Sequence, residues 1–172
     1  VVVANAGAAT SVPFTKMTAA DLTAMTSVNL TGVFNVWQAA LHDMQSAGSG
    51  RMIAIASIAG LKGMAYVSGY CAAKHGVVGL TRALAVELAP KGITVNAICP
   101  GYVETPMLER SVTNIVQKTG MSAEAAAQTL IKGNPQNRFI QAAEVAETAL
   151  WLCSDAAKSI NGQALAMSGG EV

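Results

Sequence analysis

Three polar side chains in the middle of the chain have the types and spacing of an acid–base site. Tyr70 and Lys74 are four residues apart, so on a helix their side chains lie on one face. An ammonium group held beside a phenol stabilises the phenolate and lowers the phenol's pKa from its usual value of about 10. Ser57 lies thirteen residues before Tyr70, after an apolar strand-like run, where its hydroxyl can bond a substrate oxygen. The three residues predict proton exchange with a carbonyl or an alcohol.

Other motifs accompany this group in a fixed order. Asn5-Ala6-Gly7 lies near the start, Asn29 follows Asn5 by twenty-four residues, and Pro100-Gly101 is followed by Thr105. A Tyr-x-x-x-Lys alone is weak evidence, because it arises often by chance in a helix. The whole series, however, resembles the catalytic core of the short-chain dehydrogenases/reductases, in which the serine follows a strand and Tyr-x-x-x-Lys opens the next helix.

The resemblance implies a role for each matching position. Ser57, Tyr70 and Lys74 would be catalytic, with Asn29 as a fourth member beside a water that leads protons from the lysine to solvent. A mid-helix asparagine usually has only a small destabilising effect, but the spacing favours the functional interpretation. The cofactor would be NAD or NADP, held by the residues that match the family's binding motifs: Asn5, Ala6, Gly7, Tyr70, Lys74, Pro100, Gly101, Val103 and Thr105.

Apolar patterns around these motifs predict strands that alternate with helices. The strands are expected at 1–4, 51–56, 93–99 and 163–168, and the helices at 18–47, 70–89, 107–132 with a break at Gly120, and 143–154. This alternation predicts an α/β fold with a doubly wound, Rossmann-like parallel sheet. By resemblance, the sheet is partial and contains the family's strands four to seven with their helices.

We expect one incomplete domain over 1–172, with a substrate-lid insertion at about 106–134. The chain opens on the apolar run 1–4 without Met, which is typical of a strand buried inside a sheet. We therefore expect the C-terminal two-thirds of a longer protein, either truncated or with a mobile first part. In the family that part holds the Gly-rich phosphate loop and the residue that selects NAD or NADP. The 172 residues alone are expected neither to fold stably nor to bind cofactor.

The substrate is less well determined than the chemistry. Seven residues are candidate pocket walls, although a packed surface loop is an equal alternative for those between Ser57 and Tyr70: Ala59, Leu61, Met64, Tyr66, Val67, Tyr102 and Met107. The insertion resembles that of 3-hydroxybutyrate dehydrogenases and 3-hydroxyacyl reductases. The former bind a carboxylate with His, Lys and Gln, where this chain has Ala59, Val67 and Ser111. This difference favours a neutral or thioester-linked carbonyl substrate.

Composition excludes several other functions. Charged residues make up 12% of the chain, the formal net charge is +1 and the basic residues are scattered, so no nucleic-acid partner is expected. No apolar run of about 18 residues is present, and three separated cysteines indicate neither disulfides nor a metal site, so we expect no membrane partner and a cytoplasmic location. The helices at 17–47 and 67–89 have broader apolar arcs than one sheet face needs, and the corresponding helices pair subunits in the family, so the resemblance implies a homotetramer or homodimer. The alternative to an enzyme is a truncated, non-catalytic subunit or binding scaffold.

Overall fold

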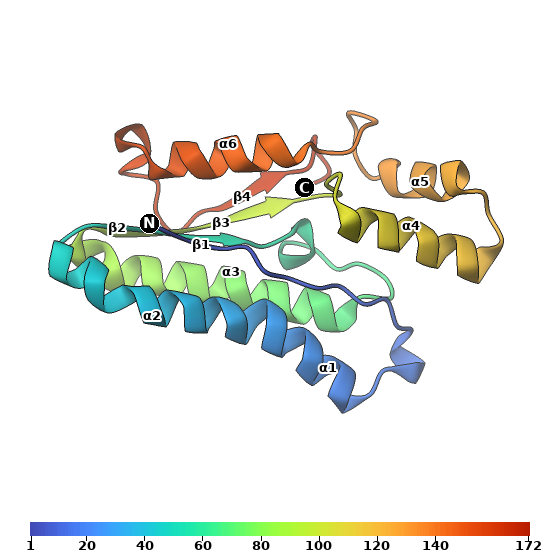
Figure 1. Cartoon of the computed structure of the whole chain (residues 1–172), viewed down its shortest axis with the longest axis horizontal. Helices are drawn as coiled ribbons and strands as arrows, with labels where there is room; N and C mark the ends of the chain where they lie inside the picture. The colour runs from blue at the N-terminus through green and yellow to red at the C-terminus, as the bar shows by residue number, and fades with distance from the viewer.

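The computed structural model describes all 172 residues and contains one sheet of four parallel strands (Figure 1). β1 (Val2–Ala4), β2 (Gly50–Ile55), β3 (Ile93–Pro100) and β4 (Ala164–Met167) lie side by side in chain order. In the register, Val3 pairs with Ile53 and Ala97 pairs with Ala164. The carboxyl ends of all four strands therefore meet at one edge, where open α/β sheets bind ligands.

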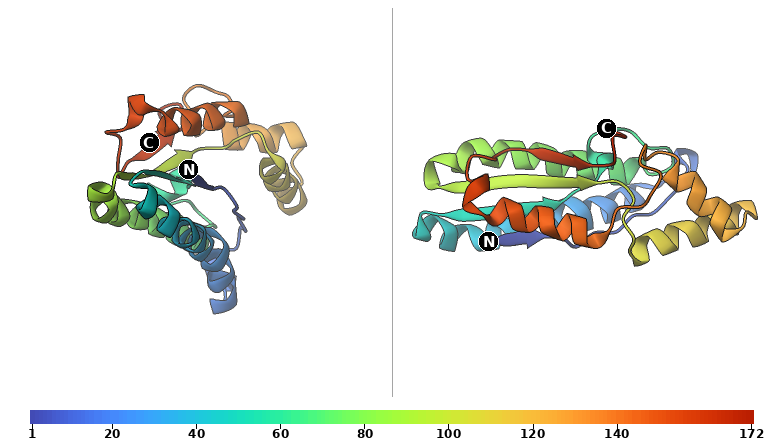
Figure 2. Two further views of the ribbon diagram at one scale, coloured as in Figure 1. Left: turned by 60° about the vertical axis from the view of Figure 1, so that its left-hand side comes forward. Right: turned by 90° about the horizontal axis from the view of Figure 1, so that it is seen from above.

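Helices cover both faces of this sheet. α2 (Gly32–Ala47) and α3 (Ser68–Leu88) pack on one face, and α6 (Ala142–Cys153) packs on the other (Figures 1 and 2). All eight residues of β3 are buried, as expected for a parallel strand that is covered on both sides. The main core, which includes Trp37, lies toward α2 and α3, and a smaller cluster around Leu152 lies under α6. The predicted α/β parallel sheet is confirmed.

The helix expected over 18–47 is interrupted once. α1 (Ala19–Thr26) begins at a capping box in which the Asp21 N–H donates to the Thr18 hydroxyl (3.2 Å) and the Thr18 N–H donates to the Asp21 carboxylate (2.8 Å). A π-helical turn (Ser27–Thr31) separates α1 from α2. This turn contains Asn29, whose amide donates to the Met25 carbonyl at 3.0 Å, and such turns are frequent at functional sites.

A pair of helices extends beyond the carboxyl ends of the strands. α4 (Pro106–Thr119) and α5 (Ala123–Ile131) are separated at Gly120, as predicted, and stand apart from the layers on the sheet (Figure 2). Glu171 near the chain end forms an ion pair with Lys62 at 2.6 Å, and its carboxylate lies against Gly133, just after α5. Three remote parts of the chain therefore meet at one carboxylate.

The remaining helical segments are single 3₁₀ turns: η1 (Phe14–Lys16), η3 (Ile58–Gly60), η4 (Ala89–Lys91) and η5 (Asp155–Ala157). No helix in the structure has both the length and the apolar character needed to cross a lipid bilayer.

Two glycines that precede strands provide a matched test of the fold. Gly48 (φ 62°) and Gly92 (φ 71°) both have left-handed backbone conformations, but a Cβ on Gly92 would lie 2.3 Å from the Gly48 carbonyl oxygen, whereas one on Gly48 would meet nothing within 4 Å. We expect Gly48→Ala to cost about 1 kcal/mol of unfolding free energy. Gly92→Ala should cost about 2 kcal/mol more, because backbone must also move. Urea denaturation of both variants measures this difference, and equal costs would contradict the close approach.

Candidate active site

A cleft of about 820 Å³ lies at the carboxyl edge of the sheet. Its walls come from the ends of β1, β2 and β3, from the first turns of α3 and α4, and from α6, and they are mainly hydrophobic. Ser57, Tyr70 and Lys74 all line this cleft. Two segments with an expected cofactor role, 5–7 and 100–105, contribute to the same walls. The fold thus brings together residues that are up to a hundred positions apart.

Ser57 is positioned by the turn that follows β2. It caps η3, and its hydroxyl oxygen accepts a hydrogen bond from the Ala59 N–H at 3.1 Å. Its side chain also lies close enough to the Tyr70 phenol to act on the pKa of that group. η3 packs closely on α3, since a Cβ on Gly60 would lie 2.7 Å from the Lys74 carbonyl oxygen. This close contact fixes Ser57 against the helix that carries Tyr70 and Lys74.

Tyr70 and Lys74 occupy successive turns at the start of α3. The Lys74 side chain is buried, with the residue only 3% exposed, and its ammonium donates a hydrogen bond to the Ile55 carbonyl at 2.8 Å. The same nitrogen lies 5.6 Å from the centre of the Tyr70 ring, within cation–π range. A carbonyl at the end of β2 therefore holds the lysine beside the tyrosine.

Asn29 is fully buried and connects the loop after β1 to the helix of the π turn. Its amide donates to the Ala8 carbonyl (2.8 Å) and to Met25, while its carbonyl oxygen accepts from the Ala8 N–H (3.2 Å). A Cβ on Gly7 would lie 3.1 Å from the Asn29 oxygen and 3.7 Å from the Lys74 nitrogen. The side chains of Asn29 and Lys74 therefore both lie next to the backbone of Gly7. All three of its hydrogen bonds go to backbone, which indicates a positioning role at least.

Two loops with an expected cofactor role border the cleft. Residues 5–7 follow β1, and the backbone of Gly7 runs close to Lys74, since a Cβ there would lie 3.7 Å from the lysine nitrogen. Opposite them, Thr105 precedes α4, and its hydroxyl donates to the Val103 carbonyl at 3.2 Å. Pro100, Gly101, Val103 and Thr105 all line the cleft, so the structure brings together every residue with an expected cofactor role.

Comparisons with known proteins agree with this arrangement. A family model described as enoyl-(acyl carrier protein) reductase matches residues 1–171. A D-beta-hydroxybutyrate dehydrogenase of Rhizobium meliloti is 41% identical over 145 residues, which cover 84% of this chain and 56% of that protein. The chain belongs to the short-chain dehydrogenase/reductase family. A 3-oxoacyl-(acyl-carrier-protein) reductase of Thermotoga maritima, also similar to it, is 36% identical over 172 residues.

Solved structures show the same fold as this short-chain dehydrogenase/reductase chain. Levodione reductase superposes with a TM-score of 0.91 at 40% identity, and an actinorhodin polyketide ketoreductase crystallised with NADPH superposes with a TM-score of 0.93 at 38% identity. The matches cover 98% of this chain but 65% and 66% of those chains. The expected partial Rossmann-like fold is confirmed, and the chain spans about two-thirds of the length of these relatives or less.

The ionisation of the central pair in this short-chain dehydrogenase/reductase differs from the sequence-based expectation. Burial raises the pKa of the Tyr70 phenol above its usual value of 10.0, and the hydrogen bond to Ser57 offsets only part of that rise. Burial also lowers the pKa of Lys74 from 10.5 to about 8. The expected lowering of the tyrosine pKa by the lysine is therefore wrong for this structure. The ammonium faces the ring and bonds Ile55, so its interaction with the phenol oxygen does not outweigh desolvation.

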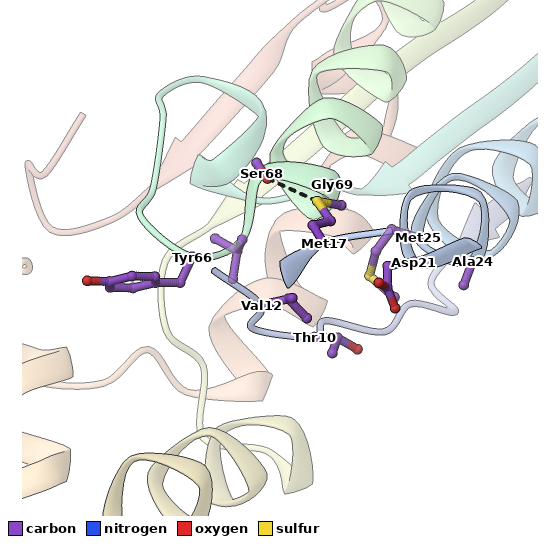
Figure 3. A pocket seen from close by; sticks show the side chains of 10 residues that line it. Thr10, Val12, Met17, Asp21, Ala24, Met25, Tyr66, Ser68 and Gly69 are labelled. Carbon is purple, nitrogen blue, oxygen red and sulfur yellow. Dashed lines mark hydrogen bonds between the residues drawn. The ribbon is translucent and has the colours of Figure 1, made fainter. Parts of the chain in front are cut away.

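Three of the seven expected pocket walls lie outside the cleft. Four residues line it as expected: Met64, Val67, Tyr102 and Met107. Ala59 is instead fully buried, and Leu61 packs against the main core. Tyr66 is 65% exposed, and it borders a separate hollow of about 60 Å³ near Met17, whose sulfur accepts a hydrogen bond from Ser68 (Figure 3). Ala59 is withdrawn from the cleft because η3 buries the residues directly after Ser57. Position between Ser57 and Tyr70 did not reveal that turn.

Several wall residues escaped prediction from the sequence. α6 contributes an apolar stripe at helical spacing: Ala142, Val145, Ala146 and Ala149. The spacing can be recognised in the sequence, but it is equally typical of a helix that simply packs against a sheet. Leu108 and Arg110 on α4 also line the cleft. No group of His, Cys, Asp and Glu side chains is arranged to hold a metal ion.

The buried Lys74 makes stability depend on pH in a defined window. Its pKa is about 8 in the folded chain and close to 10.5 when exposed. Between these values the unfolded chain holds one more proton, so the unfolding free energy should rise with pH, by up to about 3 kcal/mol. Below pH 8 both states are charged and the destabilisation by the buried cation is complete.

Lys74→Met removes this titration, because methionine fills similar volume without a charge. We expect the wild type to gain unfolding free energy relative to Lys74→Met between pH 8 and 10.5. Urea denaturation of both proteins at pH 7, 9 and 10 measures the difference, and subtraction cancels the other titrating groups. Parallel pH profiles would show that the ammonium is not desolvated.

Proposed function

We propose that the chain forms the catalytic part of an NAD(P)-dependent oxidoreductase that interconverts a carbonyl and a secondary alcohol by hydride transfer. The supporting observation is the meeting of Ser57, Tyr70 and Lys74 in one mainly apolar cleft, although they come from the end of β2 and from α3. The names of similar proteins, among them levodione reductase and D-beta-hydroxybutyrate dehydrogenase, describe such chemistry in those proteins.

The proton is handled by this chain's own residues. In reduction, Tyr70 donates its phenolic proton to the substrate oxygen as negative charge develops there, and Ser57 donates a hydrogen bond to the same oxygen. The raised pKa of Tyr70 keeps the phenol protonated for that step. Lys74 then lies close enough to stabilise the phenolate that remains. In oxidation the proton moves in the opposite direction.

The proposed cofactor site uses both loops of the cleft. Asn5, Ala6 and Gly7 would border the cofactor on one side, while Val103 and Thr105 would hold the nicotinamide carboxamide on the other. When bound, the nicotinamide supplies or accepts the hydride. NAD and NADP are both compatible with these residues.

The substrate is proposed to enter under the α4–α5 pair, with 106–134 as a lid insertion in a single domain. Met107, Leu108 and Val145 give the cleft an apolar wall that suits an acyl chain, such as a 3-oxoacyl or 3-hydroxyacyl group. A cytoplasmic location accords with three free cysteines. A homotetramer or homodimer accords with exposed apolar side chains on α1, the π turn and α2: Leu22, Val28, Phe34 and Val36.

The test is turnover by the longest natural form of the protein. NADH or NADPH oxidation is followed at 340 nm with 3-oxoacyl thioesters, simple ketones and keto acids. Carbonyl-dependent oxidation supports the proposal. Cofactor binding without turnover of any carbonyl would overturn it and favour the non-catalytic scaffold.

A further inference from the structure

The cleft contains one cation that the proposed chemistry does not use. Only two of its lining residues are positively charged, Lys74 and Arg110, and none is acidic. Lys74 is buried and bound to the Ile55 carbonyl. Arg110, on the second turn of α4, is exposed and forms no hydrogen bond or ion pair with the rest of the chain. Its guanidinium is therefore free to bind a ligand.

We propose that Arg110 binds an anionic group of the substrate, a carboxylate or a phosphate, at a distance from the reacting carbonyl. The inference rests on the proposed function, which places the carbonyl at Tyr70 and Ser57. A guanidinium can bind either anion with two parallel hydrogen bonds. Among the residues of this chain that line the cleft none is acidic, and none of them forms an ion pair with the guanidinium.

The wall composition narrows the substrate class. Met64, Val67 and Met107 offer an apolar surface in the same cleft as Arg110, whereas Tyr70 and Ser57 provide its polar reacting end. The matching ligand has a carbonyl on a short apolar chain and an anion at its other end. A free keto acid supplies the anion as its carboxylate, and a carrier-bound 3-oxoacyl thioester supplies it as the carrier's phosphate. This class keeps the thioester-linked carbonyl expected from Ala59, Val67 and Ser111 and adds a free keto acid, for which Arg110, the sequence neighbour of Ser111, supplies a cation.

The test compares charged and neutral ligands of the same shape. Acetoacetate is paired with methyl acetoacetate, and acetoacetyl-coenzyme A is paired with the acetoacetyl thioester of N-acetylcysteamine. Ligand-observed NMR measures binding to the wild type, to Arg110→Gln and to Lys132→Gln. Lys132 is an exposed cation at the end of α5 that does not line the cleft, so its variant changes the net charge equally.

Arg110→Gln should weaken binding of the charged member of one pair about tenfold, while binding of its neutral partner changes less than twofold. The affected pair identifies the anion as carboxylate or phosphate. Lys132→Gln should change the binding of neither the charged nor the neutral ligand. Raising the salt concentration should weaken binding of the charged ligand to the wild type but not to Arg110→Gln.

Equal effects on charged and neutral ligands, or no binding of either charged ligand to the wild type, would overturn the proposal. So would a loss confined to NADPH or NADH, because Arg110 would then bind a cofactor phosphate. Turnover separates this failure from that of the proposed function. If the protein reduces neutral ketones but Arg110→Gln affects charged and neutral ligands equally, the proposed function stands and only the role of Arg110 is wrong.

Discussion

Tyr70→Phe is expected to lower kcat by at least about 100-fold, because the phenol hydroxyl beside Ser57 and Lys74 is the proposed proton donor. The aromatic ring stays, so the wall of the cleft beside Lys74 keeps its shape, and the second phenol of the cleft, Tyr102, is unchanged. Cofactor affinity should therefore change less than about twofold. Stopped-flow or steady-state rates give the first quantity, and quenching of nicotinamide fluorescence gives the second.

A matched control is available in Tyr66→Phe, which removes the same hydroxyl from an exposed side chain outside the cleft. Its turnover should equal that of the wild type. A Tyr70→Phe protein that keeps more than about a tenth of the wild-type kcat would assign proton transfer to another group. A loss of cofactor binding comparable to the loss of rate would instead make Tyr70 a binding residue.

Asn29→Leu is expected to have the largest effect on stability of the changes considered. Leucine matches the size of asparagine approximately but leaves the Ala8 N–H, the Ala8 carbonyl and the Met25 carbonyl without their partner. Each unpaired backbone group costs about 1–3 kcal/mol, so a total of roughly 3–5 kcal/mol is expected with partial access of water to Ala8. Chemical denaturation monitored by tryptophan fluorescence measures it.

Asn35→Leu serves as the comparison, because Asn35 is an exposed residue on α2 and makes no hydrogen bond through its side chain. This variant should change the unfolding free energy by less than about 0.5 kcal/mol. If Asn29→Leu cost less than about 1 kcal/mol, the loop after β1 would not depend on this amide. The role of Asn29 would then have to be purely chemical.

Local patterns predicted most of the architecture. The apolar run at 93–99 became the fully buried β3, and Gly120 separated α4 from α5 where the helical pattern paused. The assembly of the site was also predictable in part, because Ser57 and Thr105 follow strands whose carboxyl ends meet in any parallel sheet. These features depend on residues near in sequence or on general topology.

The incorrect or missing predictions depended on tertiary packing. The pKa of Tyr70 is governed by burial, which no spacing rule gives. Ala59 left the pocket because η3 folds under α3, and Arg110 entered it because α4 begins at the edge of the cleft. Asn29 in the π turn likewise bonds a loop twenty-one residues away, a contact that local spacing does not predict.

The ion pair between Glu171 and Lys62 links the α4–α5 pair to the catalytic turn. Lys62 lies five residues after Ser57, and Gly133 follows α5, so the Glu171 carboxylate contacts both the end of the proposed lid and the loop that leaves the active site. If α5 swings outward, it must either leave this carboxylate behind or pull on the loop of Ser57. Substrate exchange and the alignment of the serine hydroxyl are then mechanically connected, and the rate of product release becomes sensitive to a side chain at the far end of the sequence.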